Sequence, residues 1–467
     1  MVQEYLFPYE SVPRNSRVVI YGAGRVGRSF LRQMLRTGYA HVVCLMDRSL
    51  EGNRNLVVPV IQPKVLPKED YDYFIVAINQ TDTATLVKGD LVRQYDVPEQ
   101  RIILGAERSF PLAARIYTQS SCILTGGRLR VAFFLPGGLG DCLRARKPIL
   151  AMLRFLKGAP CEPIIYGRHA EFLQVACEDF AVPLVAADED YYRDEAADCD
   201  MALYVGYFWG LDSFREERFA ELAPDLLDPL RKFCSCIREY GLDPARVTDN
   251  GLHYARCRLR GWNAYASFNM SGILEMDDQL PYLPRPTMEM GDASVPYVTL
   301  NVGWGVSDMP SSKLWPLQCW EKLVKSLKRE YPQLKVIQLG DAGAPRLQAV
   351  DDWCLGTPFT KVKRLLSYSQ IHLDTEGGLV HLATHLGTRC VVLFGPTPIY
   401  YFGYPENDNI MAGTCHDCYQ LESTYWMCYR RMTGPPCMEA ISTDLVMEHL
   451  RRDLQMTSVG QMRNQLS

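Results

Sequence analysis

Short apolar runs alternate with amphipathic runs along most of the chain, and glycine turns often separate the two. The apolar runs have the length of β-strands, and the amphipathic runs have the spacing of helices. Strand-like runs lie at 17–21, 41–46, 73–78, 131–135, 163–166, 201–205, 297–302, 335–339, 371–373 and 389–394. Helix-like runs lie at 28–37, 214–258, 316–330, 361–366 and 379–386. Strands that alternate with helices predict parallel sheets covered by helices, which is an α/β fold.

The pattern divides into three α/β blocks. We expect a small Rossmann-like domain in residues 1–125 and two further lobes in residues 126–290 and 291–467. Residues 261–295 combine several prolines and glycines with weak periodicity, so we expect the link between the two lobes there.

Composition narrows the class of protein. The 467 residues carry 50 basic and 54 acidic side chains, without a cluster of Lys or Arg, which argues against nucleic acid or a membrane surface as a partner. No apolar stretch has the length of a transmembrane helix, and no secretory signal is recognisable. Sixteen cysteines, mostly inside apolar runs, suit reduced thiols in a cytosolic protein.

The first glycine turn follows the strand at 17–21. Gly22, Gly24 and Gly27 fit the G-x-G-x-x-G fingerprint, and Asp47 lies 20 residues after Gly27. The fingerprint predicts a nucleotide at this turn, with Asp47 on a ribose hydroxyl. Because the block is only about half of a dinucleotide fold, we expect weak nucleotide binding or a docking role. An NAD-linked or bifunctional oxidoreductase remains an alternative.

The second glycine turn, Gly137-Gly138-Leu139-Gly140-Asp141, opens a helix-like run. Asp141 has two interpretations. It is either an N-cap residue that stabilises the helix or a general base that accepts the proton of an attacking hydroxyl. The glycines leave room for a substrate beside its carboxylate.

Lys313 precedes the helix-like run that begins at Pro316, and Asn301 and Gly303 follow the strand at 297–302. A cation at a helix start is electrostatically unfavourable, and an anion bound at the same place would resolve the conflict. The alternative is a solvated lysine on a loop.

The third glycine turn follows the strand at 371–373. Gly377 and Gly378 would donate backbone N–H groups to a diphosphate, and Asp374 or Glu376 would bind a ribose or sugar hydroxyl. His381 lies one turn further and, taken alone, is more simply a half-buried histidine with satisfied hydrogen bonds. Gly395 and Thr397 follow the next strand and would face the same cleft.

Four cysteines near the C-terminus form a C-x2-C-x9-C-x8-C pattern: Cys415, Cys418, Cys428 and Cys437. Four thiolates suit a structural iron or zinc ion, and the sequence does not separate the two metals. Four unrelated thiols are the alternative.

The motifs Gly-Gly-Leu-Gly-Asp, Ser-Lys-Leu-Trp-Pro, Asp-Thr-Glu-Gly-Gly-Leu-Val-His and Leu-Phe-Gly-Pro-Thr-Pro occur in this order within residues 128–450. The series resembles the ADP-heptose heptosyltransferases of glycosyltransferase family 9. The resemblance implies a GT-B fold, with two Rossmann-like lobes that have parallel sheets and face one active site. Here a small Rossmann-like domain precedes them.

The resemblance also implies a cytoplasmic bacterial enzyme that transfers a sugar, typically heptose, with inversion and without a catalytic metal. The donor would be a nucleotide sugar, and the acceptor a glycan or protein. By motif match, Asp141 is the general base and Lys313 contacts the donor phosphate. The remaining donor-binding residues are Gly138, Gly140, Asn301, Gly303, Asp374, Glu376, Gly377, Gly378, His381, Gly395 and Thr397. A similar cysteine set binds iron in autotransporter heptosyltransferases. A non-catalytic sugar-nucleotide binder remains the alternative.

Overall fold

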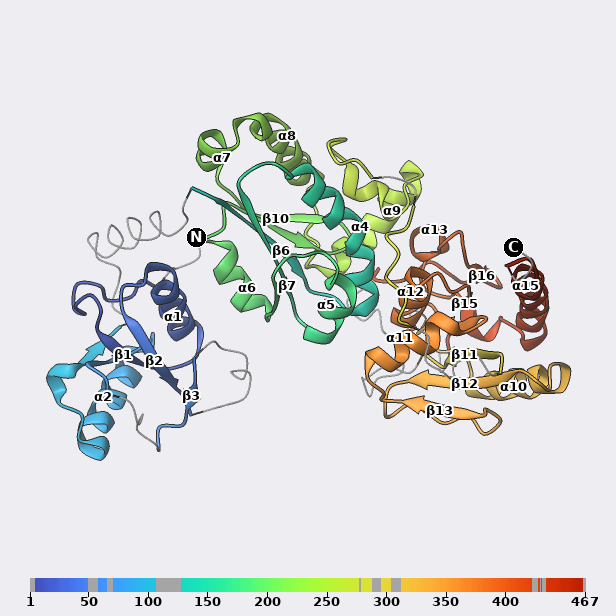
Figure 1. Ribbon diagram of the computed structural model, residues 1–467, viewed down its shortest axis with the longest axis horizontal. Coiled ribbons are helices and arrows are strands. Elements are labelled where there is room, and N and C mark those ends of the chain that lie inside the picture. Colours follow the sequence, from blue (N-terminus) through green and yellow to red (C-terminus); the bar gives the residue numbers. More distant parts are fainter. Residues whose placement is uncertain are drawn as a thin grey trace.

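The computed structural model contains three α/β units that follow one another along the longest axis of the molecule (Figure 1). The predicted α/β class is therefore confirmed. Two successive lobes with mainly parallel sheets stand after a smaller α/β unit, as a GT-B fold with an N-terminal extension requires. The predicted boundaries near residues 125 and 290 lie outside the described residues. The structure describes residues 5–48, 58–64, 70–105, 127–276, 279–287, 295–303, 312–421, 427–428, 430 and 434–464.

The first unit is a parallel sheet in the order β3-β2-β1-β4-β5, which is the strand order of a Rossmann fold. Alternate residues of β1 pack under different helices. Val18 and Ile20 contribute to the core that includes α1, whereas Val19 contributes to the core that includes α2. The elements are β1 (Arg17–Tyr21), α1 (Arg25–Thr37), β2 (His41–Met46), β3 (Val60–Ile61), β4 (Tyr73–Val76), α2 (Thr81–Tyr95), η1 (Glu99–Arg101) and β5 (Ile102–Leu104).

The middle lobe has the strand order β10-β9-β6-β7-β8, and β10 alone of these strands is antiparallel to its neighbour. The sequence pattern does not predict β10, because this strand begins soon after β9 and its last residue falls in the expected helix-like run. The few residues between β9 and β10 are enough only for a tight turn, so the two strands are antiparallel. The elements are β6 (Leu129–Leu135), α4 (Leu139–Phe155), β7 (Cys161–Gly167), α5 (Ala170–Cys177), β8 (Leu184–Ala186), α6 (Glu189–Ala196), β9 (Met201–Val205), β10 (Trp209–Phe214), α7 (Glu216–Leu222), α8 (Pro224–Tyr240), α9 (Val247–Arg260) and η2 (Ala266–Asn269).

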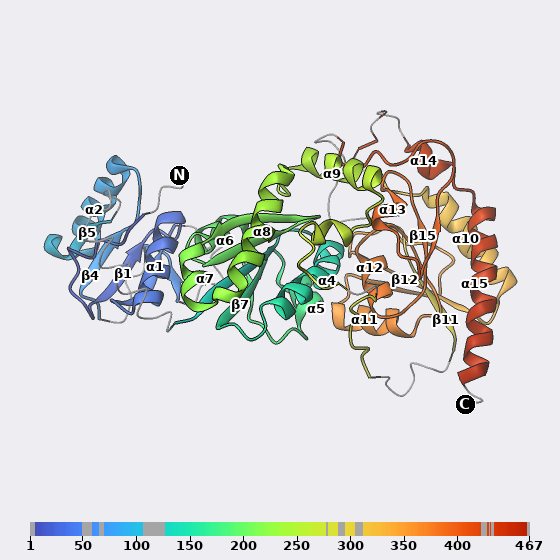
Figure 2. The same ribbon diagram turned by 90° about the horizontal axis from the view of Figure 1, so that it is seen from above.

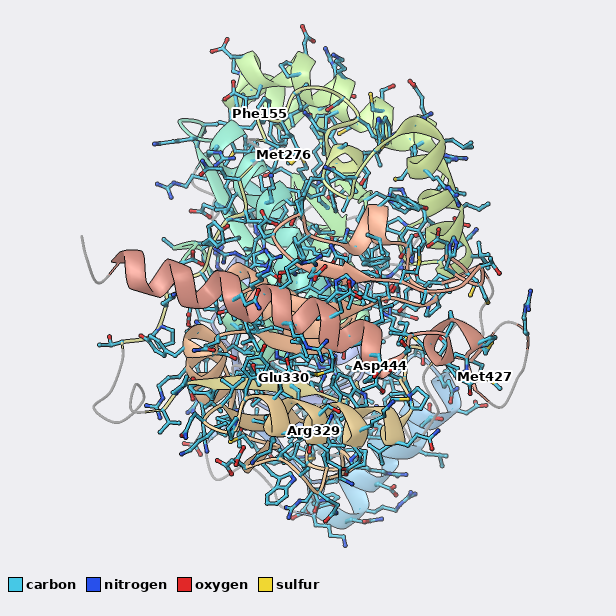
Figure 3. All side chains as sticks on the ribbon, turned by 90° about the vertical axis from the view of Figure 1, so that its right-hand side faces the viewer. Phe155, Met276, Arg329, Glu330, Met427 and Asp444 are labelled. Carbon is cyan, nitrogen blue, oxygen red and sulfur yellow. The ribbon has the colours of Figure 1, made fainter. Side chains whose placement is uncertain are left out.

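The last lobe is a parallel sheet in the order β13-β12-β11-β14-β15-β16. The C-terminal helix α15 lies along α10 (Figure 3), where Arg451 forms an ion pair with Glu330 at 2.7 Å. The elements are β11 (Tyr297–Asn301), α10 (Leu317–Glu330), β12 (Lys335–Gly340), β13 (Asp352–Leu355), α11 (Phe359–Tyr368), β14 (His372–Thr375), α12 (Gly378–His385), β15 (Cys390–Leu393), α13 (Ile399–Phe402), β16 (Asp408–Ile410), α14 (Pro436–Glu439) and α15 (Thr443–Asn464).

Strand order determines where a ligand can bind. In each sheet the first strand along the chain is central, and its two neighbours are the second and the fourth strands of that unit. The order reverses between the first and fourth strands, and ligands of open parallel sheets bind at that point, beyond the carboxyl ends of the strands. In the last lobe this point lies between β11 and β14. In the middle lobe it lies between β6 and β9.

Candidate functional site

The glycine turn of the middle lobe places Asp141 in the first turn of α4. The N-cap is Gly138, so the helix begins earlier than expected and the interpretation of Asp141 as the N-cap is wrong. Asp141 is instead the third helical residue, and its Oδ2 accepts the backbone N–H of Gly138 at 3.0 Å. A Cβ on Gly137 would lie 2.3 Å from that oxygen, which explains why glycine occupies this position. The carboxylate is half-buried and stabilises the helix end.

The glycine turn of the last lobe meets this turn. Helix α12 begins at Gly378, with Gly377 as its N-cap. A Cβ on Gly378 would lie 3.3 Å from Cβ of Leu139, and a Cβ on Gly140 would lie 2.5 Å from Cδ2 of His381. The two views of the ribbon agree that α4 and α12 lie side by side (Figures 1 and 2). Two helix N-termini from different lobes therefore bring their positive dipole ends to one place.

Lys313, Glu376 and His381 form a buried chain of contacts beside these turns. Nζ of Lys313 lies 2.5 Å from Oε2 of Glu376, and Oε1 of Glu376 lies 3.3 Å from Nε2 of His381. Nδ1 of His381 pairs with the hydroxyl of Tyr404 at 2.6 Å. Nζ of Lys313 also lies 4.3 Å from the centre of the Tyr419 ring. His381 is thus a buried histidine with satisfied hydrogen bonds, and it also touches the opposite lobe.

The charges of this chain stabilise each other. Burial alone would raise the pKa of Glu376. The charge of Lys313 and the contact with His381 have a larger effect than burial, so the pKa of Glu376 is lowered overall. Burial alone would lower the pKa of Lys313. The charges of Glu376, Tyr419 and Asp141 together have a larger effect than burial, so the pKa of Lys313 is raised overall. The conflict expected at Lys313 is therefore absent. Helix α10 begins at Leu317 with Pro316 as its N-cap, and Glu376 balances the lysine.

Asp374 is enclosed between two strands. Its side chain is 1% exposed, and both carboxylate oxygens accept from Nδ2 of Asn301, at 3.1 and 2.9 Å. Nε2 of His372 lies 3.4 Å from Oδ2. Burial raises the pKa of Asp374 and is only partly offset by His372 and Asn301. Asp374 therefore holds Asn301 in place at the end of β11. Gly303, which follows, has a φ of +73°, and its Cα approaches the hydroxyl of Thr375.

A cavity of about 410 Å³ lies at the carboxyl ends of β11 and β14 and is lined by both lobes. We call it the donor cavity. The predicted residues on its wall are Asn301, Gly303, Lys313, Asp374, Glu376, Gly377 and Gly378. The sequence pattern missed the middle-lobe residues Glu171 and Phe172. It also missed Gly340, Asp341, Gly356, Thr357 and Phe359. Gly340 ends β12 and Gly356 follows β13, and those positions at strand ends were the available signal for them.

Other predicted residues lie around the cavity or away from it. Gly140 and His381 meet in the α4–α12 contact, Gly138 and Asp141 lie in the turn that opens α4, and none of the four lines the described wall. Gly395 packs elsewhere, since a Cβ there would lie 2.4 Å from Sδ of Met438 and 3.0 Å from Sγ of Cys437. Thr397 is fully buried. Neither Gly395 nor Thr397 is among the described residues that line the donor cavity, and their role in donor binding stays a prediction.

All four predicted metal ligands line one cavity of about 260 Å³: Cys415, Cys418, Cys428 and Cys437. Burial and the neighbouring thiols raise the pKa of Cys437 to about 12, and the same two causes raise the pKa of Cys418. Among the described residues, no group of three or more such side chains is already arranged to hold an ion. The four thiols fit a structural metal by their chemistry and shared cavity, and the metal stays a prediction.

The N-terminal fingerprint has the expected tight turn. Gly22 has a φ of +107°, and a Cβ on Gly27 would lie 1.7 Å from the carbonyl oxygen of Gly22. Asp47 lies at the turn, where its Oδ2 accepts the backbone N–H of Ala23 at 2.6 Å. A nucleotide at Gly22, Gly24, Gly27 and Asp47 stays a prediction.

Helix α1, which begins at this turn, contacts the middle lobe. Nε of Arg32 lies 3.7 Å from Glu195, on α6, and 3.5 Å from Asp198, just after α6. Arg32 and Glu195 are buried, and Asp198 is half-buried. At the margin of this contact, Arg28 pairs with the exposed Asp188 at 3.2 Å. The outer face of α1 is therefore an interdomain contact.

Two further properties concern the whole described chain. None of the cysteines that the structure describes is joined in a disulfide. Within the same residues, no helix combines the length and hydropathy needed to cross a bilayer.

The comparisons with known proteins return structures only: no protein-family model and no curated protein matches the chain. The glycosyl transferase family 9 structure from Veillonella parvula DSM 2008 is 15% identical with a TM-score of 0.43, and covers 70% of this chain and 97% of its own. The iron-containing dodecameric glycosyltransferase TibC from enterotoxigenic E. coli H10407 is 14% identical with a TM-score of 0.49, and covers 70% and 77%. The E. coli ADP-heptose lps heptosyltransferase II is 16% identical with a TM-score of 0.44, and covers 71% and 100%. The chain is thus similar to solved structures of the class of transferases that its motifs resemble.

Proposed function

We propose that the protein is an inverting glycosyltransferase that moves a sugar from a nucleotide-diphosphate donor to an acceptor hydroxyl. One observation carries this proposal: the glycine turns of two lobes meet, Gly140 against His381 and Gly378 against Leu139. A cavity lined by both lobes opens beside that contact. A cleft with two helix N-termini and a lysine suits a diphosphate, and a nearby carboxylate suits a proton acceptor.

The donor would bind in the donor cavity. Its diphosphate would accept hydrogen bonds from the backbone of Gly377 and Gly378 and from Lys313. The ammonium of Lys313 has three donors, so it can bind a phosphate oxygen while it stays paired with Glu376. Gly340 and Gly356 leave space beyond the diphosphate for the nucleoside. The sugar we expect is heptose and the nucleotide ADP, by the motif resemblance.

In the proposed reaction the acceptor oxygen attacks the anomeric carbon, and the bond from that carbon to the diphosphate oxygen breaks. Asp141 accepts the proton of the acceptor hydroxyl. Negative charge develops on the departing diphosphate, where Lys313 and the helix N-termini stabilise it. The positive charge at the leaving group would thus come from Lys313 and the helix dipoles of the protein itself. The charge of Asp141 contributes to the raised pKa of Lys313, which supports the proposal that the base and the phosphate ligand share one site.

The four cysteines would hold a structural iron or zinc ion, which supplies no chemistry to the transfer. Tyr419 directly follows Cys418, and its ring packs against Lys313. A bound ion would therefore stabilise the loop that supports Lys313. For the N-terminal domain, the buried contact of Arg32 with Glu195 and Asp198 supports a docking role.

The test replaces Asp141 by Asn in the full chain. With ADP-heptose and other nucleotide sugars as donors and a panel of glycan and peptide acceptors, we expect turnover to fall by about 10²–10⁴-fold. ADP binding, measured by calorimetry, should be retained. Asp82→Asn is the matched control, because Asp82 is an exposed carboxylate in the first turn of α2. Unchanged turnover in Asp141→Asn would exclude Asp141 as the base.

A further inference from the structure

A second cavity, of about 550 Å³, lies between the two lobes and has no assigned role. We call it the Arg144 cavity. Its wall combines α4 of the middle lobe, the segment around η2, and residues 399–409 of the last lobe. None of its described lining residues lines the donor cavity. A transferase needs a place for a second substrate, so the chemistry of this wall indicates what that substrate is.

Arg144 contributes a buried positive charge to the wall. Its side chain is 5% exposed, and its guanidinium lies 4.6 Å from the ring centre of Tyr401 and 4.9 Å from that of Phe402. No carboxylate of the described residues lies within ion-pair distance of it. The acidic side chain on the described wall, Glu406, is exposed. Aromatic rings offset only part of the cost of burying a charge, so the site favours an anion.

The neighbouring Arg146, also on α4, is a buried cation whose partners are all protein groups, and it serves as a comparison for Arg144. It is 1% exposed and makes two hydrogen bonds to Asp179, at 2.7 and 2.9 Å. Its Nε also donates to the carbonyl of Pro281 at 3.2 Å. Arg146 is thus neutralised by the protein itself, whereas Arg144 faces a cavity with aromatic neighbours.

A second cation and several hydroxyl-bearing rings complete the wall. Lys147 is 6% exposed, lies one turn after Arg144 on α4, and has its Nζ 4.6 Å from the ring centre of Tyr265. Tyr265, Tyr401 and Tyr404 all line the cavity. Such rings offer an apolar face together with a polar edge, which suits a saccharide with its C–H and O–H groups.

The Arg144 cavity is connected to the proposed reaction site by direct contacts. Tyr404 on its wall binds His381, which contacts Glu376 on the wall of the donor cavity. Arg144 also follows Asp141 by one helical turn on α4. An acceptor held by Arg144 would therefore lie along the same helix as the proposed base.

We propose that the Arg144 cavity binds the acceptor, a saccharide that carries a carboxylate or phosphate group held by Arg144 and Lys147. This inference rests on the proposed glycosyltransferase function. It adds the chemical class of the second substrate and names two residues that select it.

The test uses the full chain saturated with ADP, so that the donor cavity is filled. Glucose 6-phosphate, glucuronate and glucose are titrated separately by calorimetry, and the first two distinguish a phosphate from a carboxylate ligand. We expect at least one acidic probe to bind and glucose not to bind. Arg144→Met and Lys147→Met should each weaken the acidic probe at least tenfold and leave ADP affinity unchanged. The matched control is Lys157→Met, an exposed lysine just after α4.

The outcomes separate the two proposals. Equal affinity for glucose and the acidic probes, or unchanged affinity in both Met variants, would overturn the acceptor assignment while ADP binding stands. Failure of ADP to bind the wild-type chain would count against the proposed function, and the probes would then be titrated on the free protein. If Arg144→Met does not fold, Lys147→Met and Arg144→Lys decide the question, and Arg144→Lys should retain more affinity than any variant without the charge.

Discussion

Gly140 of the middle lobe packs directly against the ring of His381 in the last lobe. A Cβ at position 140 would lie 2.5 Å from Cδ2 and 3.1 Å from Nε2 of that ring. The same ring binds Tyr404 through its other nitrogen, so it has little freedom to move away. The distance between the two lobes is therefore set by the absence of a side chain on one residue.

Gly140→Ala should push the lobes apart at this contact. We expect a loss of about 1–3 kcal/mol in stability, which is the usual cost of overpacking, together with weaker ADP binding. The control is Gly138→Ala, because a Cβ there would meet nothing within 4 Å and its φ of −75° suits alanine. Thermal unfolding of both variants measures the difference. Equal melting temperatures would show that the lobes do not pack as described.

The buried pair of Lys313 and Glu376 gives a second prediction. Glu376→Gln leaves the half-buried Lys313 without its counter-charge, and we expect a loss of about 1.5–3 kcal/mol in the free energy of unfolding. Lys313→Met should also destabilise, whereas the double variant should lose less than the sum of the single losses. Urea unfolding of the four proteins gives the coupling. Additive losses would mean that the two groups do not interact.

The glycine turns could be predicted from the sequence because the signal is local. Gly22, Gly138 and Gly377 each stand between an apolar strand and an amphipathic helix, and both patterns are visible within a short window. Part of the donor-cavity wall in the last lobe follows from that placement, since the carboxyl ends of parallel strands meet at one edge of the sheet.

The remaining features depend on contacts between distant residues. Lys313 and Glu376 are 63 positions apart, so their pairing has no sequence signature, and the lysine alone predicts only a contact with a donor phosphate or a solvated position on a loop. The run Arg144-Ala145-Arg146-Lys147 has the composition of a solvated helix face, yet all three cations are buried under other elements. Gly395 follows a strand as expected, but the packing of Met438 decides which way that turn faces.

Two buried histidines predict a loss of stability in mild acid. Burial lowers the pKa of His253 and of His385 from 6.5 to about 3, and neighbouring arginines add to the effect. Unfolded chains bind these protons below about pH 6.5 and the native protein does not, so stability falls as the pH drops from 6.5 toward 3. Each histidine contributes up to about 1.4 kcal/mol per pH unit.

The variant His385→Gln tests this pH dependence, since it removes one of the two groups. We expect unfolding free energies of this variant to fall less steeply than those of the wild type between pH 6.5 and 4. The control His169→Gln changes an exposed histidine and should keep the wild-type slope. Parallel curves for wild type and His385→Gln would contradict the assignment.

The cysteine cavity predicts one structural metal ion per chain. Metal analysis of the purified protein should find iron or zinc, and Cys415→Ser or Cys437→Ser should remove it. Chelation should lower the melting temperature, because a bound ion stabilises the folded state. Cys319→Ser is the control, since Cys319 is half-buried and lies outside the cavity. Stoichiometric metal that survives substitution of all four cysteines would place the ion elsewhere.

The docking of the N-terminal domain depends on Arg32, which is buried against Glu195 and Asp198. Arg32→Ala removes this cation from the buried Glu195, which keeps its pair with Arg130, and from the half-buried Asp198. The interface should therefore weaken by about 1–3 kcal/mol, and the domain should separate from the middle lobe. Small-angle scattering should then report a larger radius of gyration, while ADP binding in the donor cavity persists. Arg28→Ala removes only the pair with the exposed Asp188 and should leave the radius of gyration unchanged. An unchanged radius in Arg32→Ala would show that other contacts hold the domain in place.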